Sequence, residues 1–357
     1  MEKKRYANID LLKTIAILMV IVLHSQLFST NFMLNNNITT YVQYFLRIAC
    51  EGVAIFILVN GFLLINKEHF ELKKHLKKTL KVFGILIIWS ILLTVMVKLI
   101  YKEPLNIADI IKNVFVTDIN NKYTGILWFL QNLIALYLIY PVLKVLHDNE
   151  KKVYDYLFIV LLIFTMLPNL LGLISNLINT KVKFEYINII TSYMSKFQIL
   201  YNRNFLMFFM IGGYTFENKE KFENKKIRLK WILIGLFSWI MSYLYAIVIS
   251  KLQNKTYIDS FNYESIFMPC ILIGLFALTY GYQNKEKWYN KAIELVAKNS
   301  LGIYLLHIII IRIANSIVPG VLPLILRVIK VLVVFGFSTV LTYIIRKIPV
   351  LKKIIEL

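Results

Sequence analysis

Long apolar runs alternate with short polar connections from one end of the chain to the other. An α-helix rises 1.5 Å per residue, so about 20 apolar residues span the hydrocarbon core of a bilayer. The pattern predicts an all-α polytopic membrane protein, a bundle of about ten transmembrane helices. The predicted spans are 8–28, 42–65, 80–101, 125–146, 153–178, 198–217, 230–250, 260–282, 299–318 and 323–345.

Basic residues are unevenly distributed over the connections. The N-terminus, every second connection and the C-terminal segment are rich in Lys and Arg, whereas the connection 29–41 carries no charged residue. Because basic loops stay in the cytoplasm, both termini are predicted to be cytoplasmic. The net charge of +21 is therefore interpreted as an orientation signal, and no nucleic-acid partner is expected. With 58% apolar residues, 1–357 is predicted to be a single transmembrane domain in a lipid bilayer.

The first span carries an unusual polar stripe. At about 100° per residue, Asp10, Lys13, Ile17, Ile21 and His24 fall on nearly the same helix face. Ionisable groups inside a membrane are costly and usually face a partner or a cavity. We therefore expect the remaining helices to be arranged around this stripe.

The predicted topology gives every other polar residue within a span a depth. Several of them join His24 in the outward half of the membrane, which predicts one shared cavity; they are Arg47, Glu51, Gln131, Asn132, Arg203 and Arg312. Simpler interpretations remain open. Arg47 and Glu51, one turn apart, can form a structural ion pair, His307 can satisfy a backbone carbonyl, and Trp128 and Tyr304 can anchor the membrane interface.

A histidine is the usual general base near neutral pH. The sequence has no serine-nucleophile elbow, paired-cysteine motif, HExxH motif or phosphate-binding loop, and no metal site is expected. One chemistry that fits is proton abstraction by His24 from a hydroxyl that attacks an activated carbonyl. In it, Glu51 orients the imidazole, and Arg47 or Arg203 stabilises the oxyanion.

Basic residues near the cytoplasmic side suit the phosphates of a cytosolic acyl donor. We assign donor binding to Asp10, Lys13, Lys77, Lys78 and Lys81. The stretch from Lys73 to Lys81 fits an amphipathic helix at the membrane surface, or simply the basic charge of a cytoplasmic loop.

Four stretches in order resemble the integral membrane acyltransferase 3 family. The first, Ile9 to His24, is similar to the family's opening helix and ends in its functional histidine. The other three are GVAIFILVNGFLL at 52–64, LWFLQNLIALYLIYPVL at 127–143 and SLGIYLLH at 300–307. Asn60 and Lys13 depart from the family pattern, where Ser and Arg are usual.

The resemblance implies an acyl-CoA donor, acetyl-CoA above all, and a carbohydrate or lipid-linked glycan acceptor at a bacterial inner membrane. It implies that His24 is essential, and the catalytic set is completed by Glu51 and Arg47. Acceptor binding is assigned to Trp128, Gln131, Asn132, Arg203, Tyr304, His307 and Arg312.

Two alternatives to acyl transfer remain. The stronger one is a transporter or flippase of a polar envelope precursor, since buried ionisable groups suit transport equally well. A membrane-embedded receptor is less favoured, because this sequence shows no soluble partner domain. A homodimer is one arrangement that the sequence allows.

Overall fold

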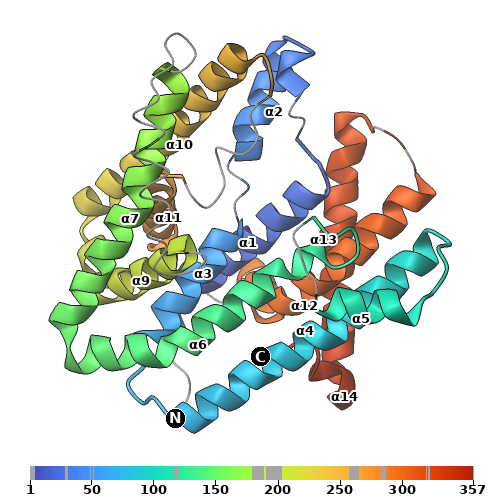
Figure 1. Ribbon diagram of the computed structural model, residues 1–357, viewed down its shortest axis with the longest axis horizontal. Helices are drawn as coiled ribbons and strands as arrows, with labels where there is room; N and C mark the ends of the chain where they lie inside the picture. Colours follow the sequence, from blue (N-terminus) through green and yellow to red (C-terminus); the bar gives the residue numbers. More distant parts are fainter. Residues whose placement is uncertain are drawn as a thin grey trace. The chain divides into compact units, whose positions relative to one another are not determined.

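The computed structural model describes residues 5–28, 31–48, 50, 52–115, 120–178, 189, 203–256, 265–282, 287–318, 320 and 322–356. Every regular element in these ranges is a helix (Figure 1). The prediction of an all-α membrane fold is confirmed.

Eight helical segments in the described ranges are long and apolar enough to cross a membrane. They are Ala7–His24, Ile38–Leu64, Leu72–Ile100, Gly125–Asn149, Lys151–Leu177, Lys225–Gln253, Trp288–Ile317 and Leu324–Lys347. Each overlaps one of the ten predicted spans. The predicted spans 198–217 and 260–282 contain the shorter helices α9 (Arg203–Glu217) and α11 (Met268–Thr279). The total of ten stays a prediction.

Two predicted spans differ in detail from the helices observed. The span 42–65 contains α2 (Ile38–Ile48) and α3 (Gly52–Leu64), with Cys50 outside either helix. The predicted surface segment 73–81 is the beginning of α4 (Leu72–Ile100), which continues without a break into the apolar part. At 29 residues α4 is about 43 Å long, more than a hydrocarbon core of about 30 Å, so its basic first turns extend beyond the apolar region.

The chain divides into two compact units, and helices α1 (Ala7–His24) and α6 (Trp128–Asn149) each contribute residues to both. Unit 1 comprises Met1–Leu12, Phe28–Glu68 and Val142–Gln283. Besides α2, α3, α9 and α11, it contains η1 (Asn31–Met33), α7 (Lys151–Ile178), η3 (Lys219–Glu223) and α10 (Lys225–Gln253).

Close backbone contact joins α3 to α9 in unit 1. A Cβ atom added at Gly61 would lie 1.8 Å from the carbonyl oxygen of Phe209, and one at Gly212 would lie 2.0 Å from that of Leu58. Membrane helices associate largely through van der Waals packing, which small residues strengthen by letting backbones approach. Glycine at these two positions therefore sets the spacing of the two helices.

Unit 2 comprises Lys13–Leu27, His69–Pro141 and Asn284–Leu357. Its complete helices are α4, α5 (Ile107–Phe115), η2 (Gly125–Leu127), α12 (Trp288–Ile317), α13 (Leu324–Lys347) and α14 (Pro349–Lys352). Gly302 of α12 lies against Thr342 of α13, where an added Cβ would be 2.3 Å from the threonine methyl group. The opposite face of α13 is an exposed apolar stripe, Leu326, Ile329, Val333, Phe337, Val340 and Ile344. Such a stripe suits contact with lipid chains.

Candidate active site

His24 is the last residue of α1, and the local backbone explains why the helix ends there. Gln26 adopts a left-handed conformation with φ of 53°. The Leu27 N–H donates to the carbonyl of Val22 at 3.2 Å, and the Gln26 N–H donates to that of Leu23 at 3.1 Å. This pair of bonds is a Schellman motif, which satisfies carbonyls at a helix end. The motif places the imidazole of His24 at the C-terminal end of α1.

The polar stripe predicted on α1 faces the protein interior. Ile17 and Ile21 are completely buried, and His24 is half-buried on the same side. In unit 2, Thr14 donates a hydrogen bond to the carbonyl of Ile293, at 3.2 Å, so α1 packs along α12. The prediction of an inward-facing stripe thus agrees with the burial of its two isoleucines.

Further along α12, the His24 ring meets the ring of His307. Their centroids are 5.3 Å apart and the ring planes differ by 49°. We call these two side chains the imidazole pair. They are separated by 283 positions in the chain, and the packing of α1 on α12 brings them together.

His307 is completely buried, and its hydrogen bonding defines which ring nitrogen carries a proton. Its Nδ1 lies 2.5 Å from the carbonyl oxygen of Tyr304, one turn earlier in α12. A carbonyl can only accept, so Nδ1 must donate, and the neutral ring then has its lone pair on Nε2. No hydrogen-bond partner for this Nε2 is found among the residues that the structure describes. The alternative that His307 satisfies a backbone carbonyl is therefore correct for Nδ1, and Nε2 remains available.

Tyr304 and Arg312 hold the segment before α6 against α12. The Tyr304 hydroxyl donates to the carbonyl of Ile126, and its ring packs on Phe129 with centroids 5.2 Å apart. The guanidinium of Arg312 donates to the carbonyl of Lys122. These contacts bring the predicted residues Tyr304, His307 and Arg312 and the beginning of α6 into one region of unit 2.

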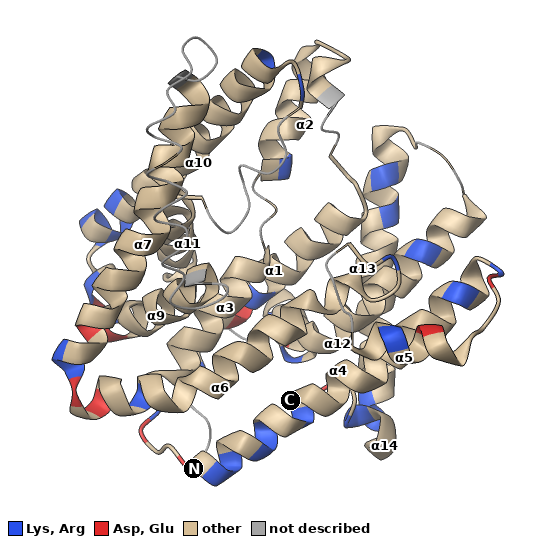
Figure 2. Cartoon of the chain, viewed as in Figure 1, with Lys and Arg blue, Asp and Glu red and all other residues tan. Residues whose placement is uncertain are grey.

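The other predicted residues of unit 2 lie on α1, α4 and the first turn of α6. Trp128 and Gln131 are half-buried, and Asn132 donates to the Trp128 carbonyl at 2.9 Å. On α4, Lys77 and Lys81 are exposed, while the ammonium group of Lys78 lies 5.2 Å from the centroid of the Tyr137 ring. Figure 2 shows basic residues gathered along this first part of α4. Lys13 is half-buried on α1.

The remaining predicted residues belong to unit 1 or lie outside the described residues. Asp10 accepts a hydrogen bond from Arg5 at 2.5 Å. Arg47 is half-buried in the last turn of α2. Glu51 lies outside the described residues, and Arg203 is described only as the first residue of α9, so the predicted Arg47–Glu51 pair and the roles of both arginines stay predictions.

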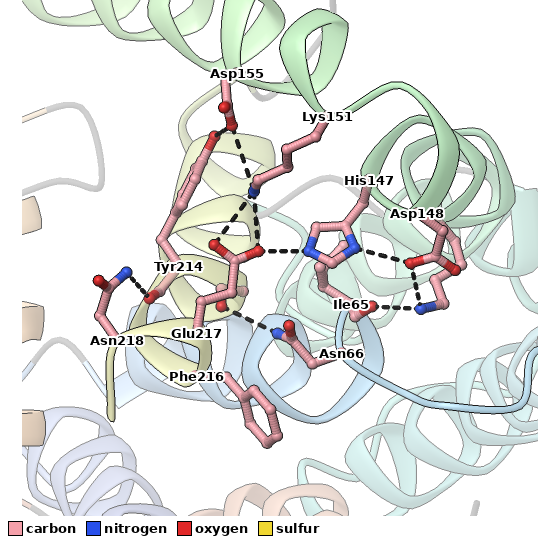
Figure 3. Close-up of polar contacts among 12 residues, drawn as sticks. Ile65, Asn66, His147, Asp148, Lys151, Asp155, Tyr214, Phe216, Glu217 and Asn218 are labelled. Atoms are coloured by element: carbon pink, nitrogen blue, oxygen red, sulfur yellow. Dashed lines mark hydrogen bonds and ion pairs between the residues drawn. The ribbon is translucent and has the colours of Figure 1, made fainter. Parts of the chain in front are cut away.

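A second group of polar side chains, not predicted from the sequence, lies in unit 1. His147 contacts Asp148 through Nδ1 at 2.9 Å and Glu217 through Nε2 at 2.5 Å, and Lys151 contacts Glu217 at 2.9 Å (Figure 3). We call these four residues the ion cluster. The sequence signal for this cluster is the spacing of His147 and Lys151, which lie four residues apart on either side of the junction between α6 and α7.

The structure thus defines a multi-pass membrane protein with an imidazole pair between two of its apolar helices. Residues 6–347 match a family model described as an acyltransferase domain, Acyl_transf_3. The match includes nearly the whole chain and residues of both compact units, so the protein belongs to this family of membrane acyltransferases. No curated protein and no solved structure gives a significant match.

Proposed function

We propose that this protein transfers an acyl group, acetyl in particular, from acyl-CoA to a hydroxyl of a cell-envelope polysaccharide or its lipid-linked precursor. Membership of the acyltransferase family supports the reaction class. The contact between His24 and His307 carries the proposal for the site, because it gives a half-buried histidine a neutral, buried neighbour whose Nε2 can accept a hydrogen bond. We place the reaction in a bacterial inner membrane with both termini in the cytoplasm.

In the proposed mechanism, His24 is the general base. It removes the proton of the acceptor hydroxyl as the oxygen attacks the thioester carbonyl. The new C–O bond forms as the C–S bond breaks, the CoA thiolate leaves, and the proton on His24 passes to that thiolate. Arg47 or Arg203 stabilises the oxyanion that develops between these events.

His307 is a positioning residue in this mechanism. Its Nδ1–H is held by the Tyr304 carbonyl, which leaves the lone pair on Nε2, and its ring centroid lies 5.3 Å from that of His24. An N–H of His24 that turns to this lone pair leaves the other His24 nitrogen unprotonated for the acceptor hydroxyl. Hydrogen bonds of this kind are often long before substrate binds and shorten in the reacting complex.

The donor is proposed to approach from the basic cytoplasmic end of the bundle. Lys77 and Lys81 are exposed on the first turns of α4, where CoA phosphates can reach them. Lysine pairs with phosphate as a point charge. Lys13, Lys78 and Asp10 complete the set assigned to donor binding.

The test is transfer of label from [14C]acetyl-CoA by the purified protein in nanodiscs, with bacterial envelope lipid and glycan extracts as acceptors. We expect wild-type protein to label a glycan or glycolipid and His24→Gln to lose the transfer. His147→Gln serves as the matched control and retains it. Wild-type protein that neither binds acetyl-CoA nor labels any extract would contradict the proposal and favour transport of a precursor.

A further inference from the structure

A pocket of about 320 Å³ lies in unit 1, between helices that carry none of the imidazole pair. Its lining comes from α7, α9, η3, α10 and α11. The lining residues are Phe158, Ile211, Tyr214, Thr215, Asn218, Lys221, Phe222, Ile227, Trp231 and Ile273. The volume is in the range of pockets that bind small ligands.

Most of this lining is apolar, and its polar groups are largely used within the protein. The Tyr214 hydroxyl donates to Asp155 at 2.5 Å, and the Thr215 hydroxyl donates to the carbonyl of Ile211 at 2.7 Å. The Asn218 amide donates to the Tyr214 carbonyl at 2.8 Å, as Figure 3 shows for the two labelled residues. A ligand with many polar groups would therefore find few free partners, and an apolar body suits the pocket better.

Lys221 gives the pocket one positive charge, and no carboxylate occurs among its lining residues in the described chain. The position of Lys221 is set by the neighbouring Phe222. The Phe222 ring is buried against Phe276 and Tyr280, with ring centroids 5.2 and 5.8 Å away. Lys221 itself is exposed to solvent. The pocket thus combines a mostly apolar lining with one exposed cation.

The sequence around the pocket places it near a membrane surface. Basic residues are concentrated in the first turns of α10, at Lys225, Lys226, Arg228 and Lys230, whereas η3 carries Lys219 and Lys221 beside Glu220 and Glu223. Such a cluster next to an apolar helix attracts the anionic lipids of the cytoplasmic leaflet. Trp231 lies at this level with its side chain in the pocket lining, as is typical of interfacial aromatic residues.

We propose that this pocket binds an acyl chain of an anionic phospholipid, whose phosphate lies at Lys221. The charge of Lys221 matches a lipid phosphate, and the six apolar lining side chains match its chain. A soluble anion such as acetyl-CoA would leave the apolar interior largely unmatched. The proposal concerns a site in unit 1 and is independent of the acyl transfer proposed for the imidazole pair.

Trp231 provides a direct probe, because bromine on a lipid chain quenches a tryptophan that it touches. Full-length protein is reconstituted in vesicles of dioleoyl-phosphatidylcholine with increasing fractions of brominated phosphatidylglycerol or brominated phosphatidylcholine. The difference in fluorescence between wild type and Trp231→Phe isolates the signal of this residue. We expect half-maximal quenching at about fivefold less phosphatidylglycerol than phosphatidylcholine, the factor for ~1 kcal/mol per lysine–lipid contact.

Two variants separate this site from general attraction of anionic lipid. Lys221→Gln is expected to remove the selectivity for phosphatidylglycerol over phosphatidylcholine. The matched control is Lys225→Gln, which should retain this selectivity because Lys225 is exposed and outside the pocket lining. Equal quenching by both lipids, or an equal loss of selectivity in both variants, would overturn the proposal. Release of quenching by acetyl-CoA would also overturn it and identify the pocket as a donor site.

Discussion

Two histidines, His307 in unit 2 and His147 in unit 1, are held by opposite kinds of partner. His147 has a carboxylate at each ring nitrogen, so both nitrogens must donate and the ring is an imidazolium. His307 has a backbone carbonyl at Nδ1 and the His24 ring beside it, with no carboxylate in either contact. A charged histidine with both nitrogens occupied is suited to holding helices together. A neutral one with a lone pair on Nε2 is suited to accepting a hydrogen bond that orients a neighbouring base.

Exchanging the imidazoles for amides should separate the two roles most clearly. His24→Gln is expected to lower acyl transfer by about 10²-fold or more, because general-base catalysis contributes at least that much. His307→Gln should reduce kcat more than it raises KM and shift the pH–rate profile, since it changes the proton affinity of His24. The measurement is initial rates of acetyl transfer over a series of pH values.

His147→Gln is the control for these variants and should keep the wild-type rate and pH profile. A His307→Gln enzyme with an unchanged pH profile would remove His307 from the mechanism. Loss of activity in His147→Gln to the same extent as in His24→Gln would contradict the distinction between the two histidines.

Glu217 of the ion cluster is the last residue of α9, and α9 packs closely on α3. A methyl group at Gly61 of α3 should therefore disturb the ion cluster. In Gly61→Ala, the ideal position of the new Cβ atom lies only 1.8 Å from the carbonyl oxygen of Phe209. Such overpacking costs about 1–3 kcal/mol. We expect a lower thermal midpoint in detergent by scanning fluorimetry.

Gly84→Ala is the matched control, because nothing lies within 4 Å of a Cβ at that position of α4. It should unfold at or above the wild-type temperature, since alanine favours a helix over glycine. Equal thermal midpoints for Gly61→Ala and Gly84→Ala would show that the α3–α9 spacing does not limit the thermal stability of the protein.

Removing the imidazolium tests the structural role of the ion cluster itself. His147→Ala leaves Glu217 with Lys151 as partner, so we expect a loss of about 1–2 kcal/mol and not a collapse of the fold. The exposed His69 provides the comparison, and His69→Ala should have almost no effect. Chemical denaturation in mixed micelles measures both, and equal stabilities would contradict a structural role for His147.

The smallest effect is expected from an ion pair of unit 2 that lies outside the apolar spans. Hydrogen bonds from Lys122, at 2.7 Å, and Tyr123, at 2.5 Å, lower the pKa of Glu103. The folded state thus binds this proton less readily than the unfolded chain. The stabilisation is present above the ordinary Glu pKa of about 4.3 and is lost as the pH falls through the lowered pKa.

The thermal midpoints of wild type and Glu103→Gln should therefore differ slightly at pH 7 and converge as the pH falls below about 4.3 and through the lowered pKa of Glu103. Lys112→Gln, which changes a charge on α5 without touching this pair, should show no such convergence. A constant difference between wild type and Glu103→Gln over this pH range would exclude the titration of Glu103 as its cause.

Much of the helical layout was predictable, because hydrophobic length and loop charge act locally along the chain. Eight of the ten predicted spans overlap helices that are long enough to cross a membrane. Helix ends were less predictable. The continuation of α4 through its lysines depends on solvation of long side chains beyond the apolar region. The non-helical position of Cys50 leaves no strong mark in hydropathy.

The candidate site was predictable in part. His24 was selected from its helix face, its depth and the resemblance, and Tyr304 and His307 from the resemblance; all three lie in one region of unit 2. The ion cluster was overlooked, because His147 and Glu217 are 70 positions apart and neither occurs in an unusual sequence pattern. Pairing across that separation depends on how α9 packs.

By itself the sequence determined that this is a helical membrane protein and that one face of its first helix is polar. Those properties follow from periodicity and from the cost of placing charges in hydrocarbon. Only the tertiary structure decided that His24 meets His307, that His307 donates through Nδ1, and that glycines bring α3 onto α9. The physical reason is that these contacts join residues far apart in the chain, so they arise from helix packing and not from any local pattern.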